Sequence, residues 1–526
     1  MIMKKLTALL LVLSICTFLT FASNTSRMYS QNDTEVRMVR NICIENGVFY
    51  PSVFPVTGED LVRALEAIPE ENRDDLFWDL YRQVESPEVL ISDDYFAADV
   101  SVNINLTGYL HTGKEAEALL PAYRDIPPMA EATGEVYFGN TYMLLSFMEK
   151  DPVLSFPVNT NWSTLLDGRS TGFTQAYQPF EVGISTGNEY FNFQLGRNRQ
   201  SFGRGITGNM VIGDNFSYQE YIRLSWTSSV FEYHLDVTHF DQQESANDFS
   251  SFRLNGMHNL RAMHNAAVRI GNRFEFRVYL GATFETDNPL EWRIVTPFTV
   301  YHSYNNFSES REIAPGDEAN NLLGVELTYI PASGWKTGFQ VVMDQLQLKY
   351  ESTDSVPNAF GFLANAEYAA RLGTGHIRIY GEAALTQPWL YLNYKYNKDG
   401  SQNFNYDHVY GYGYGTSSEI SYSGYSFGPD SLVLTMGCTF DTQTVNAGCS
   451  VLYYAHGDHG IGTSNPTLKD YSGSNNFLSH VMEQLLILSL EGSYALSAHV
   501  RLSCQFRQSF LSRTATMLSA GISLTF

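Results

Sequence analysis

The sequence has few cysteines. Five occur in 526 residues, and four of them lie beyond residue 23: Cys43, Cys438, Cys449 and Cys504. Their spacing matches neither a zinc motif nor a dense disulfide framework. The last three share the apolar parity of the alternating segments described below, so we expect them to act as small apolar side chains.

Basic residues and long apolar runs are also scarce. Lys and Arg number 33 against 56 Asp and Glu, which gives a formal net charge of -23. A chain of this charge repels phosphate groups, so we expect no nucleic-acid partner and no binding to an anionic membrane surface. No run of about 18 apolar residues follows residue 23, so no membrane-spanning helix is expected. A place in a membrane would then require a closed sheet, because lipid offers backbone groups no hydrogen-bond partners.

Residues 1–23 differ from the rest in being strongly apolar. Lys4 and Lys5 precede the run LTALLLVLSICTFLTFAS, which ends in small residues. This order predicts a secretory signal peptide, with an anchoring helix as the alternative. Without Lys4 and Lys5 the formal net charge changes from -23 to -25.

Residues 24–91 carry helical patterns. Thr57 and Asp60 form a capping-box pattern, and apolar residues follow at helical spacing: Leu61, Val62, Leu65 and Ile68. A second stripe is made by Leu76, Phe77, Leu80, Tyr81 and Val84. We predict a small periplasmic helical segment that either plugs the structure that follows or covers its end.

From about Ser92 the apolar period becomes two. Phe274, Phe276 and Val278 alternate with Glu275 and Arg277, and similar patterns recur over 100–106, 231–237, 377–382 and 500–507. Each strand therefore has an apolar face and a polar, often charged face. In a soluble sandwich the apolar face would cover a core, whereas in an outer-membrane barrel it would face lipid.

Thr516–Phe526 shows the same alternation. Leu518, Ile522 and Leu524 lie on one parity, with Ser519 and Ser523 on the other. The stretch resembles the last strand of bacterial outer-membrane barrels, whose terminal aromatic residue belongs to the signal for the barrel assembly machinery. We therefore favour the barrel, with outer-membrane lipid around it.

The connections between these strands fall into two classes. Long stretches rich in Gly, Asn, Ser, Asp and Tyr separate some strands: 110–129, 301–320, 350–358, 391–415 and 455–478. Others are short, such as Asp441–Thr444. Residues 92–526 number 526 − 91 = 435, which at strands of about 9–11 residues suggests roughly 16–20 strands.

One stretch resembles a known family. Leu195–Trp226 carries Gly196-Arg197, Phe202-Gly203, the loop glycines Gly205 and Gly208, and the run Ile212–Asn215. In this order the residues resemble the capsule assembly Wzi family of outer-membrane proteins, although Phe202 stands where a Trp is usual. Weaker similarity extends over about 190–370.

The resemblance implies an all-β fold: a large antiparallel transmembrane barrel of about 18 strands, formed by residues 92–526 behind the helical segment 24–91. It implies a monomeric, lectin-like anchor that binds surface polysaccharide, such as capsule or exopolysaccharide. It transfers no ligand residues. A porin-like passive diffusion channel or hydrophobic-solute transporter is the alternative function.

Four arginines in the signature stretch are candidate ligand-binding residues: Arg197, Arg199, Arg204 and Arg223. In one interpretation they pair with acids inside the barrel, such as Glu220. In the other they donate forked hydrogen bonds to the carboxylates of an acidic polysaccharide. The sequence leaves both open.

A tyrosine-rich region supplies a second candidate: Tyr391, Tyr394, Tyr396, Tyr406, Tyr410, Tyr412 and Tyr414. Exposed tyrosines stack on sugar rings and donate hydrogen bonds, and we predict this role for Tyr410, Tyr412 and Tyr414. An ordinary loop or an aromatic girdle at the membrane edge explains the same residues.

The sequence gives little support for a metal site or for enzymatic activity. His456, Asp458 and His459 lie close together, but metal ligation needs a further ligand and fixed geometry. The sequence leaves open whether His456 and His459 bind a metal, and we expect no metal site and no cofactor. No Gly-x-Ser-x-Gly elbow is present, so we expect no enzymatic activity, with a Ser-His-Asp lipid hydrolase as the remaining enzymatic possibility.

Overall fold

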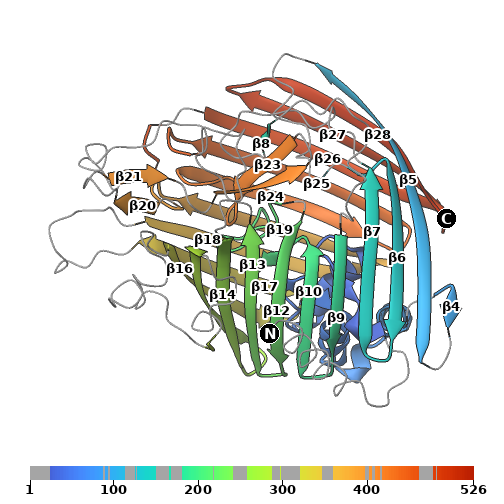
Figure 1. Ribbon diagram of the computed structural model, residues 1–526. Coiled ribbons are helices and arrows are strands. Elements are labelled where there is room, and N and C mark those ends of the chain that lie inside the picture. Colours follow the sequence, from blue (N-terminus) through green and yellow to red (C-terminus); the bar gives the residue numbers. More distant parts are fainter. Residues whose placement is uncertain are drawn as a thin grey trace.

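The chain forms a closed antiparallel β-barrel (Figure 1). The computed structural model describes residues 24–86, 89–92, 95–112, 125, 127–149, 165–167, 181–216, 218–240, 258–286, 296–297, 320–345, 359–391, 393–396, 402–405, 409–414, 417–460, 478–480 and 483–526. Over these residues 18 strands form the wall. They are β5 (Phe96–Thr112), β6 (Ala130–Phe138), β7 (Thr141–Glu149), β9 (Glu181–Gly187), β10 (Phe191–Asn198), β12 (Gln219–Thr227), β13 (Phe231–Phe240), β14 (His258–Ile270), β15 (Phe274–Thr286), β16 (Asn320–Ala332), β17 (Trp335–Gln345), β18 (Ala359–Leu372), β19 (Gly375–Thr386), β24 (Ser431–Asp441), β25 (Val445–His456), β26 (Glu483–Ser497), β27 (Val500–Leu511) and β28 (Ala515–Thr525). The predicted fold class is confirmed.

The last strand closes the barrel against the first. β28 pairs antiparallel with β5, with Ile522 opposite Leu106. Beyond β28, the Phe526 amide donates to the Val102 carbonyl at 2.9 Å, and the Val102 amide donates back at 3.0 Å. The strand predicted at Thr516–Phe526 therefore forms the seam of the barrel.

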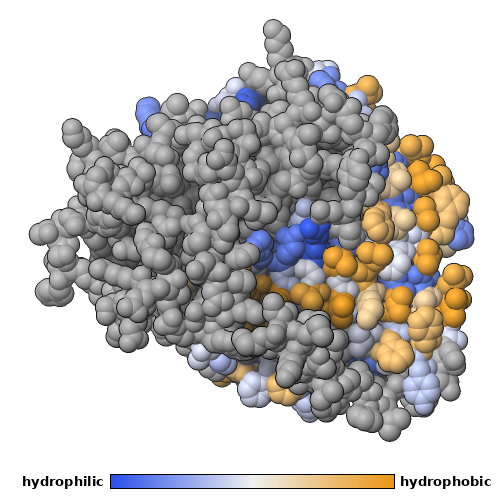
Figure 2. Space-filling view, in the orientation of Figure 1, coloured by the Kyte–Doolittle hydropathy of each residue, from blue (hydrophilic) through white to orange (hydrophobic). Residues whose placement is uncertain are grey.

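The wall is apolar outside and charged inside. On β15, Phe274 and Phe276 are 41% and 43% exposed, whereas the charged residues Glu275 and Arg277 are 1% and 0% exposed. A soluble sandwich would show the opposite pattern. Figure 2 shows apolar side chains gathered on the outer surface over β5, β6 and β7. The strands therefore have the outward apolar band of an outer-membrane barrel.

An outward-facing charge at mid-strand should destabilise the barrel. Met436 lies in the middle of β24 and is 66% exposed, so Met436→Arg is expected to lower the free energy of unfolding by about 2–4 kcal/mol, because the guanidinium group meets hydrocarbon. Leu496→Arg, near the end of β26, is the matched control and should cost about 0–1 kcal/mol. Chemical unfolding in lipid vesicles measures both values. Equal costs for the two variants would contradict a membrane position for this band.

The two ends of the barrel differ in their connections. At one end, which we call the tight-turn end, consecutive strands are joined by a few residues, as in Asp441–Val445, where the Thr442 amide donates to the Val445 carbonyl at 2.8 Å. Longer connections lie at the other end, the long-loop end. The connection between β19 and β24 contains three strands within the predicted loop 391–415: β20 (Asn393–Tyr396), β21 (Gln402–Asn405) and β22 (Val409–Tyr414). A fourth strand, β23 (Ser417–Tyr422), follows and pairs with β8 (Leu165–Asp167).

The segment 24–91 contains three α-helices: α2 (Thr34–Asn46), α3 (Gly58–Glu66) and α4 (Asp75–Glu85). It also holds η1 (Asn24–Ser26), η2 (Glu70–Asn72) and the short strands β1 (Met28–Tyr29), β2 (Val53–Phe54), β3 (Val56–Thr57) and β4 (Ile91–Ser92). The predicted capping box between Thr57 and Asp60 is confirmed at the start of α3. No helix in the described residues is long and apolar enough to cross a membrane.

The helical segment packs inside the barrel at the tight-turn end (Figure 1). The Gly334 amide, in the turn after β16, donates to the Ile44 carbonyl of α2 at 2.9 Å. Asn41 of α2 donates to Asp441 at 3.0 Å, and Glu45 contacts His376 at 2.8 Å. These contacts join α2 to three separate turns of the wall. Of the two arrangements left open by the sequence, the structure has the plug.

Candidate functional site

The signature stretch forms a loop that folds into the barrel. β10 and β12 pair within the wall, and residues 199–216 between them, which we call the inward loop, turn back into the lumen. There β11 (Ser201–Phe202) pairs with β2 of the plug, so that Phe202 lies opposite Val53. The Gly203 amide donates to the Ser52 carbonyl at 2.8 Å. The inward loop from one end therefore meets the plug from the other.

Two glycines of the inward loop lie where a side chain does not fit. Gly203 has a φ of +121°, and a Cβ there would lie 2.5 Å from Asn209 Oδ1. A Cβ on Gly205 would lie 1.8 Å from the Gly208 carbonyl oxygen. The glycines of the signature stretch therefore allow a tight fold of the loop within the lumen.

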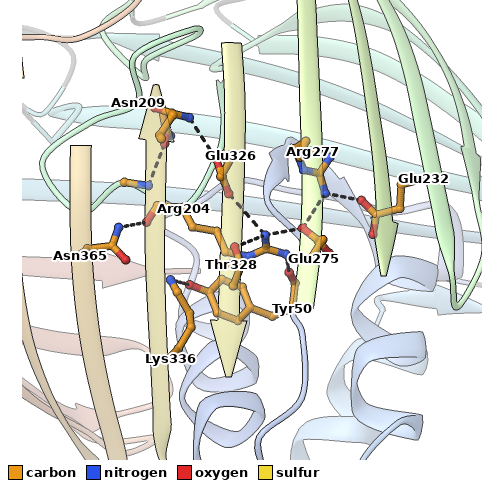
Figure 3. Close-up of polar contacts among 12 residues, drawn as sticks. Tyr50, Arg204, Asn209, Glu232, Glu275, Arg277, Glu326, Thr328, Lys336 and Asn365 are labelled. Carbon is orange, nitrogen blue, oxygen red and sulfur yellow. Dashed lines mark hydrogen bonds and ion pairs between the residues drawn. The ribbon is translucent and has the colours of Figure 1, made fainter. Parts of the chain in front are cut away.

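Arg204 joins the inward loop to both the wall and the plug (Figure 3). Its Nη1 lies 2.5 Å from Glu275 Oε1 and 3.4 Å from Glu326 Oε1, both on the wall, and its Nη2 donates to the Tyr50 carbonyl of the plug at 2.7 Å. Asn365 of β18 donates to the Arg204 carbonyl at 3.0 Å. All of these groups are buried. The guanidinium group of Arg204 is thus a buried junction of three parts of the molecule.

The network around Arg204 continues along the wall. Arg277 contacts Glu232 at 2.6 Å and Glu275 at 3.2 Å, and Arg269 contacts Glu275 at 2.9 Å. Glu232 of β13 contacts Arg277 of β15, and Glu275 lies two positions before Arg277 on the same strand, as Figure 3 shows. Each charge of this network therefore has a partner of opposite sign, which offsets the cost of removing it from water.

Two further charged groups hold the plug. Arg223 of β12 contacts Asp236 at 3.2 Å and donates to the carbonyls of Phe54 and Pro55 at 3.1 and 2.9 Å. Its guanidinium carbon lies 4.9 Å from the centre of the Phe202 ring. Lys336 of β17 donates to the Tyr50 hydroxyl at 2.8 Å, and Glu367 lies between Lys336 and Arg378.

The other side of the inward loop packs against the long-loop end. The Tyr391 hydroxyl donates to the Met210 carbonyl at 2.6 Å, and Asn215 donates to the Tyr422 carbonyl at 2.8 Å. Apolar side chains of the loop and of the 389–427 segment form one buried cluster with the wall: Phe202, Met210, Val211, Ile212, Trp389, Leu390, Tyr391, Tyr422, Tyr425 and Phe427. The described residues therefore fill the lumen from both ends.

The four candidate arginines do not form one surface. Arg197 contacts Glu220 at 2.5 Å, as predicted, but both share the outward parity of Leu195 and Ile222, so the pair lies on the outside of the wall and not in the interior. Arg199 contacts Asp214 at 2.9 Å and Asp125 at 3.0 Å near the long-loop end.

Arg204 and Arg223 are enclosed. Their side chains are only 2% and 1% exposed, and their guanidinium groups contact the wall and the plug. In this conformation neither has a face that a polysaccharide could reach. They hold the lumen closed, which corresponds to the interior-pairing interpretation.

The candidate tyrosines also lie in different parts of the structure. Tyr391 is buried with its hydroxyl bonded to Met210, so the expected exposure of this residue is wrong. Tyr410, Tyr412 and Tyr414 lie in β22. Their contact with sugar stays a prediction. Tyr394 and Tyr396 lie in β20, and Tyr406 lies outside the described residues.

Two residues from elsewhere in the chain, Asp430 and Ser479, join the group of His456, Asp458 and His459. His456 is buried with Nδ1 2.6 Å from the Gly457 carbonyl oxygen. Ser479 Oγ and Asp430 Oδ2 both lie 3.1 Å from the same atom, His459 Nδ1. A Ser-His-Asp triad uses the two ring nitrogens separately, so this is not the geometry of that triad.

Comparison with known proteins decides the fold. No family model and no curated protein matches the chain. Among solved structures the chain is similar to Wzi of Escherichia coli, described as an outer membrane protein involved in group 1 capsule assembly and a carbohydrate-binding β-barrel. The identity is 14%, the match covers 97% of this chain and 100% of that one, and the TM-score is 0.57. The chain has the Wzi barrel fold. The resemblance read from Leu195–Trp226 is thereby confirmed for the fold.

Other barrels are less similar than Wzi. A loop-deletion mutant of OmpT from Vibrio cholerae matches with 9% identity over 82% of this chain and 100% of its own, at a TM-score of 0.36. OccK3 of Pseudomonas aeruginosa matches with 7% identity over 82% of this chain and 95% of its own, at a TM-score of 0.40.

Proposed function

We propose that the protein is a non-catalytic outer-membrane barrel that binds or organises surface polysaccharide, as a lectin-like anchor for capsule or exopolysaccharide. The observation that carries the proposal is the filled lumen: the inward loop and the plug meet through β11 and β2. In the part of the chain that the structure describes, the filled barrel leaves its outer end for binding and no wide path through the lumen. The Wzi fold supports the proposal, because the solved Wzi structure is described as a carbohydrate-binding barrel.

The long-loop end offers suitable chemistry for such binding. In outer-membrane barrels the longer loops face outward from the cell, and Arg199 lies at this end beside Asp125 and Asp214. Arginine donates paired hydrogen bonds to the carboxylates of acidic sugars. Tyr410, Tyr412 and Tyr414 of β22 would stack on sugar rings.

Binding should be measured with the full chain in detergent. The immobilised protein is expected to bind polysaccharide extracted from the surface of its own bacterium, and Arg199→Gln should weaken this binding because it removes a guanidinium at the long-loop end. Arg82→Gln, on the exposed surface of α4 at the other end, is the matched control and should bind like the wild type. Absence of binding to any envelope polysaccharide would contradict the proposal.

The same protein should be closed to ions. In planar bilayers the wild type is expected to give no steady conductance steps, because buried side chains of the plug and the inward loop occupy the lumen. The alternative function, a passive diffusion channel or hydrophobic-solute transporter, predicts open channels or solute uptake into vesicles. Steady conductance would favour that alternative over the anchor.

A further inference from the structure

Three segments bring potential metal ligands together at the long-loop end. Asp430 immediately precedes β24, Asp458 and His459 follow β25, and Ser479 precedes β26. The ligand atoms of Asp430, Asp458 and His459 all lie within 4.8 Å of one another. Residues almost 50 positions apart, Asp430 and Ser479, are in direct contact. The group lies outside the network that closes the lumen.

The contacts show that the ligand atoms face one small volume. Asp430 Oδ2 lies 3.1 Å and Asp458 Oδ1 3.0 Å from His459 Nδ1. Ser479 Oγ contacts the same two carboxylate oxygens. Two carboxylate oxygens, one hydroxyl and one imidazole nitrogen therefore converge. Such a mixture of oxygen and nitrogen donors is what zinc and similar divalent metals bind.

The charges in this group do not balance. Among the described residues, no lysine or arginine pairs with Asp430 or Asp458, and His459 is the histidine in direct contact with both. Asp430 is completely buried. Two carboxyl groups thus converge on one small volume with no lysine or arginine beside them in the described residues, and a bound cation would compensate their charge.

We propose that Asp430, Asp458 and His459 bind one divalent cation, with Ser479 or water in the fourth position. The imidazole nitrogen favours zinc over calcium and magnesium, which prefer all-oxygen sites. The ion would link both ends of the β25–β26 connection to the start of β24. It would thus fasten one long connection at the outer end of the barrel.

The residues around Asp430 hold its carboxylate in a fixed orientation. The Ser479 amide donates to Asp430 Oδ1 at 2.8 Å, and the His459 amide donates to Asp430 Oδ2 at 3.2 Å. A Cβ on Gly457 would lie 2.0 Å from Asp430 Oδ2, so only glycine leaves room for the carboxylate. The Trp389 ring packs edge-on against His459, with centroids 4.6 Å apart. These contacts fix ligand geometry in the way that outer-shell partners of metal sites do.

The test uses the full chain in detergent, stripped of metal with a chelator and titrated with zinc chloride by calorimetry. The wild type is expected to bind one zinc ion per chain. Asp430→Asn and His459→Gln are expected to lose this binding event. His480→Ala is the matched control, because His480 is an exposed histidine next to Ser479, and it should bind zinc like the wild type.

Three results would contradict a zinc site at Asp430, Asp458 and His459. Absence of zinc binding in the wild type, or equal binding by the wild type and His459→Gln, would overturn the proposal. So would calcium binding without zinc binding, because it would contradict the role of His459. Since Asp430→Asn could fail to fold, the heat-dependent gel mobility of each variant shows that the barrel is intact, and His459→Gln provides the independent test. The polysaccharide proposal is unaffected by any of these results.

Discussion

Arg204→Met is expected to lower the free energy of unfolding by about 3–5 kcal/mol, because removing one partner of a buried ion pair leaves the other charges buried without compensation. Arg204 is the cation that joins Glu275 and Glu326 of the wall to the Tyr50 carbonyl of the plug. Methionine keeps similar bulk but donates no hydrogen bond. Equilibrium unfolding in denaturant, followed by tryptophan fluorescence in detergent micelles, gives the difference.

Arg82→Met is the matched control for this substitution. Arg82 also pairs with a carboxylate, Asp79, but the two side chains are largely exposed on α4. Surface ion pairs contribute about 0–1 kcal/mol, so this variant should unfold almost like the wild type. A cost below about 1 kcal/mol for Arg204→Met would show that the plug and the inward loop do not depend on this junction.

Phe202→Ala should cause a second large loss, about 3–5 kcal/mol, because removing a buried aromatic ring leaves a cavity that the surroundings fill only in part. Phe202 is 0% exposed and lies in the apolar cluster formed by the inward loop, the wall and the 389–427 segment. Its ring also lies under the Arg223 guanidinium. The same unfolding experiment measures the loss.

Phe276→Ala serves as the control of equal size. Phe276 faces outward on β15 with 43% of its surface exposed, so its truncation opens no cavity in the protein and should cost less. If the outward variant were the more costly of the two, the cluster around Phe202 would not be a main source of stability.

The strand pattern could be predicted from the sequence because the barrel imposes one simple rule. Each wall strand has lipid on one side and the filled lumen on the other, so Phe274 and Glu275 must differ in polarity. The register between neighbouring strands could also be predicted where a short turn joins them. The capping box at Thr57 was predictable because its two hydrogen bonds involve residues only three positions apart.

Helix α2 was missed because its apolar residues do not gather on one face. Val36, Met38, Val39, Ile42, Cys43 and Ile44 are buried around much of its circumference, since the plug surrounds one side and the wall the other. A helix buried on several sides gives no clear stripe. The inward course of residues 199–216 was missed for a related reason: the pairing of β11 with β2 joins segments about 150 residues apart, and no local pattern encodes it.

The position of Asp430 beside Asp458 and His459 could have been predicted from the sequence. The turn after Asp441 sets a register in which Ser431 lies opposite His456. Counting one position further places Asp430 beside Gly457 and therefore next to Asp458 and His459. The predicted hairpin alone would have indicated Asp430 as the third ligand. Asp430 was missed because it lies on the opposite side of the hairpin and is not a sequence neighbour of His459.

The pairing of β28 with β5 also constrains when the plug can be enclosed. Thr525 lies opposite Asn103 across this seam, so the ring of strands cannot be completed before β28 has been synthesised. The helices α2, α3 and α4 precede β28 in the chain and are therefore surrounded only after it has joined the wall. An assembly intermediate with an open seam would leave the charges of Arg204 and Glu275 accessible to water, and completing the ring removes them from it.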